Sequence, residues 1–464
     1  MKLRLCAAIL AGKIAAGLAR LCGRRGSSLP GVVALRLYPG VLRALVKQVR
    51  LGVIVVTGTN GKTTTSNMIA EMLAAAGFRI VNNREGANLI TGVTAAFVRA
   101  ARLVGKITCD YAVLEVDEAS FPRVVAQTEP ELVVITNFFR DQLDRYGELD
   151  TTVSFIRRTL AERPHVSLVL NADDPLVSQL ASCSLDVIFY GVAPRSGARG
   201  RVGGAREARF CPLCGYALEY TCYHYSQLGM YRCEACGFGR PRPHVEATAA
   251  SVGGQVLRAR LRWDDMVISV VLPTRGVYNL YNALAAFTAG IVLGIDPATA
   301  TASLGSYTPA TGRLQGFLYQ GKPVYLNLVK NPAGFNETLN LLLAGRSTRD
   351  VFIAINDNDA DGRDISWLWD VDFEVLAGAD DILGFICSGK RGEEMAVRLK
   401  YAGVPPRKIT VVESLRAAVD RTLNGPGEAA YFLATYTALW PVEKLLRRRV
   451  TRDTKYAHGL SSLS

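Results

Sequence analysis

Acidic residues are absent from the first 50 positions, which carry ten lysines or arginines. The whole chain has four histidines, which leaves little material for a catalytic Cys–His pair. Neither glycine nor proline is enriched enough for a fibrous protein, and 49% hydrophobic with 20% charged residues excludes a disordered chain. At roughly 100 to 200 residues per domain, the length of 464 residues predicts two to four globular domains.

The basic head lacks an apolar run suited to a signal peptide or a spanning helix. Lys13 interrupts the apolar stretch from Leu3 to Leu21, and no small-residue cleavage pattern follows it. We therefore expect a cytoplasmic chain at the inner face of the cell membrane. The helical spacing of the apolar residues fits two interpretations, a basic amphipathic helix on an anionic membrane surface or a docking helix with a solvated basic face.

Ten cysteines in a cytoplasmic chain need an explanation other than structural disulfides. Four of them form two CxxC pairs, and the glycine after each pair permits a tight turn. A closed tetrahedral zinc site of structural type is predicted from Cys211, Cys214, Cys233 and Cys236. Because flexible, Gly- and Arg-rich sequence flanks the two pairs, we expect an inserted zinc ribbon at about 205–240.

A nucleotide-binding loop is predicted near position 60. The β-branched run Val53–Thr57 is followed by GTNGKTTT and then by a helical pattern through Ala75. In this arrangement backbone N–H groups turn toward phosphates, Lys62 can reach the β- and γ-phosphates, and the Thr63 hydroxyl can hold Mg²⁺. The usual first glycine of the phosphate-loop pattern is replaced by Val56, so the loop is a variant.

The segment GTNGKTT resembles the ATP-binding loop of the Mur ligase family, and later elements support the resemblance. These are YAVLEV at 111–116, TN at 136–137 with DQLDRYG at 141–147, NADDP at 171–175 and GVYNLYNA at 276–283. The resemblance implies ATP and Mg²⁺ as cofactors, with Thr63 and Glu115 as magnesium ligands. It also implies a set of nucleotide contacts, namely Thr59, Asn60, Gly61, Lys62, Thr63, Thr64, Asn279, Asn282 and Arg313.

Several departures from the family pattern argue against an enzyme that builds the UDP-linked stem peptide. Gln142 replaces the histidine that holds a second magnesium, and no lysine lies between Tyr146 and Asn171 for the carbamylated lysine of many relatives. Asn327 stands in place of the nucleotide-contacting aspartate. The head of about fifty residues is also too short for a complete UDP-sugar-binding domain.

The C-terminal segments are similar to the MurT family, the ligase-like subunits of lipid II isoglutaminyl synthases. They are KNPAGFN at 330–336, INDNDADGRDISWLW at 355–369 and SGKRG at 388–392. This resemblance implies ATP-dependent amidation of the D-glutamate α-carboxyl of the lipid II stem peptide, through an acyl phosphate. A GatD-like glutamine amidotransferase partner would supply the ammonia, because the chain lacks a glutaminase motif: Phe385, not glycine, lies two residues before Cys387.

The acidic run near position 360 fits two interpretations. In the MurT family an aspartate here is expected to orient the partner's catalytic histidine, and we assign Asp357 first, with Asp361 and Asp364 behind it. The alternative is that these acids merely cap a loop and a helix. A calcium loop is disfavoured because Leu368 stands where its bidentate glutamate belongs.

The predicted fold class is α/β. We expect a basic N-terminal segment (1–49), a Mur ligase-type parallel-sheet ATP-binding domain (50–310) that carries the ribbon, and a smaller C-terminal α/β domain of MurT type (311–464). Expected strands of the latter are Val351–Ile355, Asp381–Cys387 and Tyr431–Ala434. ATP should bind between the two domains.

Two rival functions are weighed against amidation. A folylpolyglutamate-like or Mur-type amino-acid ligase is disfavoured by the missing second-metal residues and by the Asp-rich C-terminal segment. A nucleic-acid-binding ribbon is disfavoured because the positive charge is concentrated in the head. We expect no nucleic-acid partner.

Overall fold

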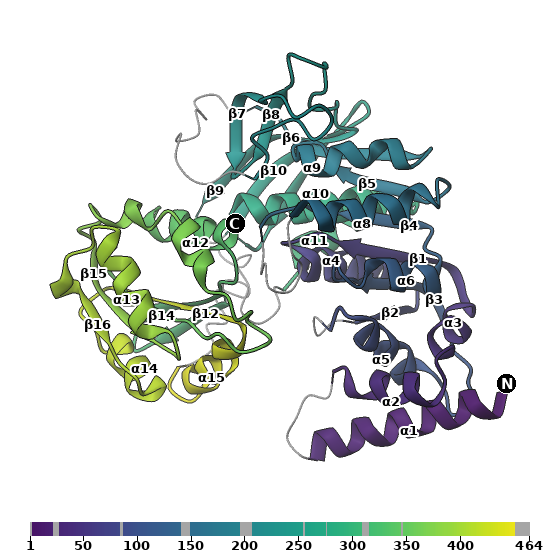
Figure 1. Ribbon diagram of the computed structural model, residues 1–464, viewed down its shortest axis with the longest axis horizontal. Coiled ribbons are helices and arrows are strands. Elements are labelled where there is room, and N and C mark those ends of the chain that lie inside the picture. The colour runs from purple at the N-terminus through teal and green to yellow at the C-terminus, as the bar shows by residue number, and fades with distance from the viewer. Residues whose placement is uncertain are drawn as a thin grey trace.

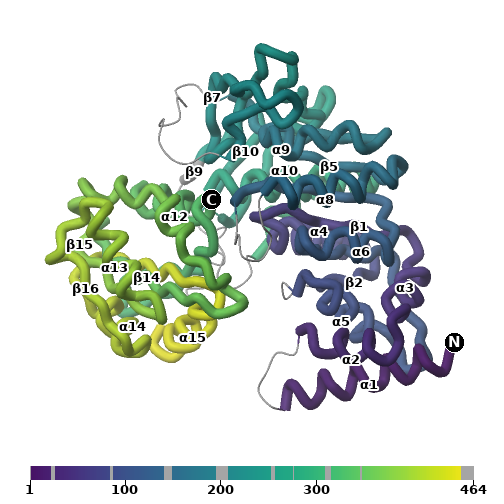
Figure 2. Tube along the Cα trace, viewed as in Figure 1, coloured from purple at the N-terminus to yellow at the C-terminus, as the bar shows by residue number. Residues whose placement is uncertain are grey.

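The computed structural model describes residues 2–21, 27–83, 87–140, 149–194, 207–253, 256–274, 276–308, 315–344 and 347–450. Two α/β units, each built on its own sheet, lie side by side (Figure 1). The polypeptide path from the basic head to the last helix is easiest to follow in the Cα trace (Figure 2). The expected α/β class with a C-terminal α/β unit is confirmed.

The first sheet has nine strands in the order β11-β10-β9-β6-β5-β4-β1-β3-β2. From β2 to β9 all neighbours are parallel. Their central strands are almost wholly apolar because helices cover both faces. The strands are β1 (Val49–Thr57), β2 (Ile80–Asn82), β3 (Cys109–Glu115), β4 (Leu132–Ile135), β5 (Ser167–Asn171), β6 (Val187–Val192), β9 (Val245–Gly253), β10 (Val256–Trp263) and β11 (Met266–Leu272).

One edge of this sheet departs from the parallel pattern. Strands β9, β10 and β11 pair antiparallel. The link between β10 and β11 is a tight turn at Asp264 and Asp265, with Asp264 at a φ of 50°. Such a turn can join only antiparallel neighbours, because a parallel pair needs a long crossover.

Helices cover the two faces of the first sheet. On one face α4 (Lys62–Ala75), α10 (Val277–Val292) and α11 (Pro297–Ser306) share a core with the strands. The other face packs against α5 (Ile90–Ala100), α6 (Phe121–Thr128), α8 (Leu149–Ala161) and α9 (Pro175–Ser178), with the short helix η1 (Gln179–Cys183).

The basic head folds as three helices against this second face: α1 (Lys2–Leu21), α2 (Leu29–Leu37) and α3 (Val41–Val46). Helix α2 approaches α5 so closely that a Cβ on Gly31 would overlap the Thr91 carbonyl. The head therefore docks on the α/β unit. Among the described residues, no helix combines the length and the apolar character that crossing a bilayer requires.

The second sheet has six strands in the order β12-β13-β17-β14-β15-β16. They are β12 (Gln315–Tyr319), β13 (Lys322–Leu328), β14 (Arg349–Ala354), β15 (Ile382–Ser388), β16 (Ile409–Val411) and β17 (Ala429–Ala434), so the three expected strands are confirmed within two residues. Helices α12 (Pro332–Leu343) and α13 (Gly392–Tyr401) cover one face, with η2 (Ser366–Asp370), η3 (Phe373–Leu376) and η4 (Pro406–Lys408) on the connections. The other face packs against α14 (Leu415–Leu423) and α15 (Tyr436–Arg447).

A two-stranded hairpin, β7 (Glu219–Tyr225) and β8 (Leu228–Arg232), lies between β6 and β9 in the sequence. Its two strands stand at one end of the first sheet, near β9 and β10 (Figure 1). The hairpin and the two CxxC turns together form the expected four-cysteine insertion, which is called the ribbon below.

Candidate nucleotide-binding and partner-contact sites

The loop between β1 and α4 has the backbone geometry of a phosphate site. Gly58 and Gly61 adopt φ values of 116° and 87°, which other residues rarely reach. A Cβ on Gly61 would collide with the Asn282 amide, and a Cβ on Gly58 would collide with the Thr136 hydroxyl. Both positions therefore require glycine, because of their positive φ values and because a Cβ would not fit. The N-terminus of α4 faces the position that phosphates take in such loops.

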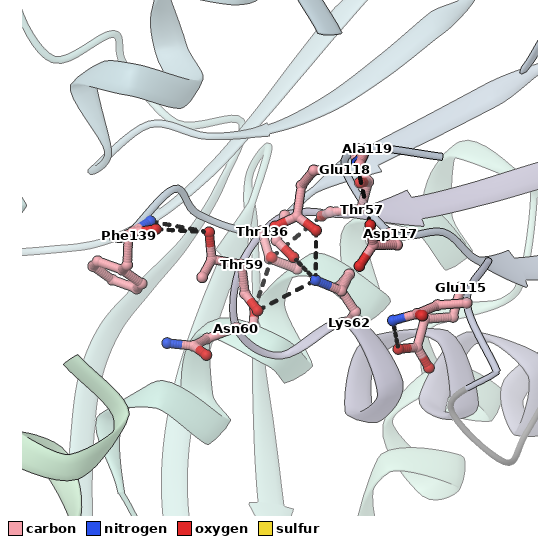
Figure 3. A network of polar contacts seen from close by, with 12 residues as sticks. Thr57, Thr59, Asn60, Lys62, Glu115, Asp117, Glu118, Ala119, Thr136 and Phe139 are labelled. Carbon is pink, nitrogen blue, oxygen red and sulfur yellow. Dashed lines mark hydrogen bonds and ion pairs between the residues drawn. The ribbon is translucent and has the colours of Figure 1, made fainter. Parts of the chain in front are cut away.

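Lys62 is buried and lies in an acidic surrounding (Figure 3). Its Nζ is 2.8 Å from Glu118 Oε2 and donates to the Gly58 carbonyl at 2.5 Å. Burial alone would lower the pKa of Lys62, but the carboxylates of Glu118 and Asp117 outweigh it and raise the pKa. Burial likewise opposes ionisation of Glu118, yet Lys62 and Lys330 hold the pKa of this carboxyl below its usual value. The lysine is thus a fixed cation at the end of the loop.

The TN pair at the end of β4 clamps the loop in place. Thr136 Oγ1 and Asn137 Nδ2 both donate to the Asn60 carbonyl, at 2.8 and 3.1 Å. Asn137 Oδ1 accepts from the Asn60 N–H at 2.9 Å, and the Thr59 hydroxyl contacts the backbone of Phe139 (Figure 3). The resemblance at TN therefore has a physical basis, since these side chains fix the loop's own backbone.

The NADDP segment supports the same region from behind. Asp174 caps α9 by accepting from the Leu176 N–H at 3.0 Å, and it also accepts from the Phe138 N–H at 2.9 Å. Burial raises the pKa of Asp174 to about 7. Asp173 accepts from Tyr281 Oη at 2.6 Å, which ties this segment to α10.

A cavity opens beside the loop, between the two α/β units. The described residues that line it come from the loop, the ribbon, α10 and the C-terminal unit: Asn60, Gly61, Thr64, Asn137, Tyr225, Tyr278, Asn282, Asn327, Leu328, Lys330, Ala333, Gly334, Glu337 and Thr338. Of these, Lys330 supplies a basic side chain and Glu337 an acidic one, and burial raises the pKa of Glu337 to about 7.

The two units meet directly at the loop. Asn60 and Asn331 exchange side-chain hydrogen bonds of 3.3 and 3.0 Å, and Lys330 Nζ donates to the Thr59 carbonyl at 3.2 Å. An ion pair of 3.0 Å joins Arg140 to Asp370. The C-terminal unit therefore contributes its own groups to the rim of the phosphate loop.

The remaining predicted nucleotide and magnesium residues take different places. Asn279 and Asn282 are buried on α10 and bonded to each other at 3.3 Å. Thr63 and Thr64 lie in the first turn of α4, and the buried Glu115 ends β3. Glu115 Oε1 accepts from Asn88 Nδ2 at 3.3 Å. Arg313 and the DQLDRYG segment with Gln142 lie outside the described residues.

The four predicted zinc ligands come together. The thiol sulfurs of Cys211, Cys214, Cys233 and Cys236 all lie within 4.8 Å of one another. Tetrahedral Zn–S bonds of about 2.3 Å place sulfurs roughly 3.8 Å apart, so this set fits a zinc ion. Each CxxC turn is closed by the same backbone hydrogen bond, in which the glycine after the second cysteine donates to the carbonyl of the first cysteine. The distance is 2.9 Å from Gly215 to Cys211 and 3.0 Å from Gly237 to Cys233.

The three candidate aspartates differ in what they contact. Asp357 is half-buried and lies 2.7 Å from Arg391 Nη2, whose hydrogen bond lowers the pKa of the carboxyl. Asp361 is buried and accepts from the Thr437 N–H at 2.7 Å. Asp364 accepts from the Ser366 N–H at 2.8 Å, so it caps the turn into η2. Capping thus accounts for Asp364, whereas Asp357 keeps an ionised carboxylate near the surface.

Comparison with known proteins places the chain in a family. The family model of the Mur ligase middle domain matches residues 56–206, and that of the MurT ligase C-terminal domain matches residues 328–439. The lipid II isoglutaminyl synthase (glutamine-hydrolyzing) subunit MurT of Staphylococcus aureus strain N315 is 39% identical over 95% of this chain and 97% of that protein. The chain belongs to the MurT family. The MurT subunit of Streptococcus pneumoniae R6 is 34% identical over 97% of the chain and 98% of its own length.

The fold of this MurT-family ligase subunit is shared with solved Mur ligase-like structures. A pseudomurein peptide ligase type C from Methanothermus fervidus superposes with a TM-score of 0.66, at 23% identity, over 87% of this chain and 80% of that one. This likeness confirms the Mur ligase-like α/β fold.

Several groups at the site were missed by sequence reasoning. Glu118 lies three residues beyond Glu115 in the segment EVDE, and its acidity was a signal that could have flagged a partner for Lys62. Tyr225 and Glu337 belong to the ribbon and to α12, far from any nucleotide motif. Only the packing of these elements brings them to the cavity.

Proposed function

We propose that this chain, together with a GatD-like glutaminase subunit, amidates the α-carboxyl of D-glutamate in the lipid II stem peptide. The carrying observation is 39% identity over nearly the full length of a MurT subunit whose name specifies lipid II and glutamine hydrolysis. The phosphate loop and the cavity beside it support an ATP-dependent activity. Because the substrate is lipid-linked, the reaction would take place at the inner face of the cell membrane.

ATP would bind between an ATP-binding domain at 50–310 and a C-terminal domain at 311–464. Its phosphates would lie on Thr59–Thr64 and its nucleoside in the cavity with Asn279 and Asn282 nearby, while Arg313 would contact phosphate. Magnesium, held by Thr63 and Glu115, would supply charge neutralisation on the phosphates. The hydroxyl and carboxylate oxygens of these two residues are the donors that this ion prefers, so they fit it.

The proposed chemistry has two steps. A carboxylate oxygen of D-glutamate attacks the γ-phosphorus of ATP, which forms an acyl phosphate and releases ADP. Ammonia then attacks the acyl carbon, phosphate leaves, and the nitrogen loses a proton to give the primary amide. Lys62 is a fixed cation that can stabilise charge on the transferring phosphoryl group, and Lys330 lies within reach of the same loop. Closure of the two units would exclude water from the acyl phosphate.

Ammonia would come from the partner subunit. Cys387 of this chain is fully buried, and burial raises the pKa of its thiol to about 12, so it is unsuited to glutamine hydrolysis. Asp357 is our first choice for the aspartate that orients the partner's histidine, with Asp361 and Asp364 behind it. Its support is a partly exposed carboxylate that Arg391 keeps ionised.

The four-cysteine cluster is proposed to hold a structural zinc ion. Four sulfurs fill the tetrahedral coordination of zinc and leave no open position for a substrate. Nucleic acid has no place in the proposed reaction.

The test is product mass and ATP turnover with purified lipid II. The chain is assayed alone with glutamine, with ammonium chloride, and with glutamine plus a purified GatD-like subunit. We expect a carboxyl-to-amide change in the second and third reactions and none in the first. A requirement for a free amino acid, with a product heavier by a whole residue, would replace amidation by the amino-acid ligase alternative.

A further inference from the structure

Helix α1 presents an exposed apolar stripe. Leu3, Leu10, Ile14, Leu18 and Leu21 are 87%, 48%, 54%, 57% and 85% exposed. They recur at intervals of three, four or seven residues and therefore lie on one face of the helix. These five residues are called the α1 stripe below.

The opposite face of α1 fixes the helix to the protein. Ala8, Ile9, Gly12 and Ala19 are buried against the α/β unit. A Cβ on Gly12 would come within 2.9 Å of the Pro30 carbonyl oxygen. Figures 1 and 2 show α1 along the lower edge of the molecule, with α2 and α5 on one side of it and no described element on the other. The α1 stripe therefore faces outward.

Charge indicates what the α1 stripe contacts. Lys2, Arg4 and Arg20 are exposed on the same helix, and no acidic residue occurs in positions 1–50 to neutralise them. Lys13 adds a fourth cation and donates to the Arg99 carbonyl at 3.0 Å. An apolar face flanked by cations is the pattern of a helix that lies in the interface of an anionic membrane. A protein partner that carries both acidic and basic residues would not explain why the charged residues of α1 are all positive.

We propose that α1 docks the protein on anionic phospholipid, with the α1 stripe inserted among the acyl chains and the basic residues against the headgroups. The helix would lie in the membrane plane, since its buried face stays attached to the α/β unit. This docking does not depend on the amidation activity. Its role would be to hold the enzyme at the surface where a lipid-linked substrate diffuses.

The test is co-sedimentation of the full chain with vesicles of equal parts phosphatidylglycerol and phosphatidylcholine, or of phosphatidylcholine alone. We expect binding to the anionic vesicles that weakens as salt increases. Lys2→Gln/Arg4→Gln/Arg20→Gln should weaken it about five-fold per charge, or on the order of 100-fold together. Ile14→Ser/Leu18→Ser should weaken it at least about ten-fold, since two inserted side chains are lost.

The matched control is Leu185→Ser/Val267→Ser, which removes two exposed apolar side chains remote from α1 (89% and 62% exposed) and should bind like wild type. Equal binding to both vesicle types, or unchanged binding of Ile14→Ser/Leu18→Ser, would overturn the proposal. If wild type does not bind vesicles and Ile14→Ser/Leu18→Ser has a changed oligomeric mass, the α1 stripe is a contact between copies of the chain. That result would also overturn the proposal. The α1 variants are also assayed for amidation of detergent-solubilised lipid II, a reaction that needs no membrane docking. This assay separates failure of the docking proposal from failure of the proposed function.

Discussion

Replacing Tyr225 by alanine should weaken ATP binding without removing zinc from the ribbon. Tyr225 ends β7 and lines the cavity beside Gly61, although it belongs to an insertion and not to a nucleotide motif. Its ring lies 5.7 Å from those of Phe139 and Tyr281. Among the described residues, none hydrogen-bonds the Tyr225 hydroxyl. The aromatic side chain is therefore fixed by packing, with its polar end available to a ligand in the cavity.

The size of the effect follows from the loss of one aromatic wall. Contact between an aromatic side chain and a nucleobase is worth about 1–3 kcal/mol on truncation to alanine, which corresponds to roughly five- to 100-fold in affinity. Truncating a buried aromatic also costs about 3–5 kcal/mol of folding stability. Tyr225→Phe keeps most of the packing and should therefore retain stability and most of the ATP affinity.

The assay is titration with ATP in the presence of Mg²⁺, accompanied by zinc content and thermal unfolding. Tyr216→Ala is the matched control, because Tyr216 is in the same ribbon but 57% exposed and not on the cavity. Removing zinc with a chelator should weaken ATP binding in wild type, and by less in Tyr225→Ala, where the wall is already lost. ATP affinity of Tyr225→Ala equal to wild type would refute the reasoning. An equal effect of chelation in both proteins would refute the coupling to zinc.

Three further predictions concern Lys62, Asp357 and Asp174. Lys62→Met should abolish ATP binding and lower the thermal midpoint, because the buried Glu118 carboxylate loses the cation that lies 2.8 Å away, a change that costs about 3–5 kcal/mol. Adding Glu118→Gln should restore the midpoint in calorimetry but should not restore ATP binding. Asp357→Asn should stop glutamine-dependent amidation in the presence of the partner and spare the ammonium-dependent reaction; loss of both would contradict its assigned role. Because burial raises the pKa of Asp174 from 3.8 to about 7, the folded state retains a proton that the unfolded state loses. Stability measured by denaturant unfolding should thus fall between about pH 4 and 7, with up to about 1.4 kcal/mol per unit from Asp174. The slope should be shallower in Asp174→Asn, where Glu337, whose pKa burial also raises to about 7, still contributes.

The elements that local sequence determines were predicted well. The apolar run of β1, the glycines of the loop and the helix through Ala75 all occur as expected, because each depends on residues close in the sequence. The four cysteines converge because each CxxC turn is a local structure and the β7–β8 hairpin between them brings the two turns together. Antiparallel pairing of β10 and β11 was missed because the expectation of a parallel sheet was applied to the whole domain and the Asp264 turn was not considered.

Contacts between distant segments were beyond sequence reasoning. Asn60 and Asn331 are 271 positions apart, and nothing in either segment indicates that their amides pair. The aspartates at 357–364 were equally hard to assign. Their spacing in the sequence does not show which carboxylate caps a turn and which one stays partly exposed. Arg391 and Thr437, which make that distinction, come from other elements.

The ribbon illustrates how an insertion can become part of a site. Tyr231, next to the cysteine cluster, donates to the Ala172 carbonyl at 3.0 Å, and Gln227 donates to the Phe138 carbonyl at 2.5 Å. Phe138 directly follows Asn137, which holds the phosphate loop. Because every link in this path is a hydrogen bond or a covalent neighbour, movement of the hairpin would be transmitted to the loop. A metal ion in the proposed four-cysteine site would therefore fix one wall of the cavity beside the loop as well as the ribbon itself.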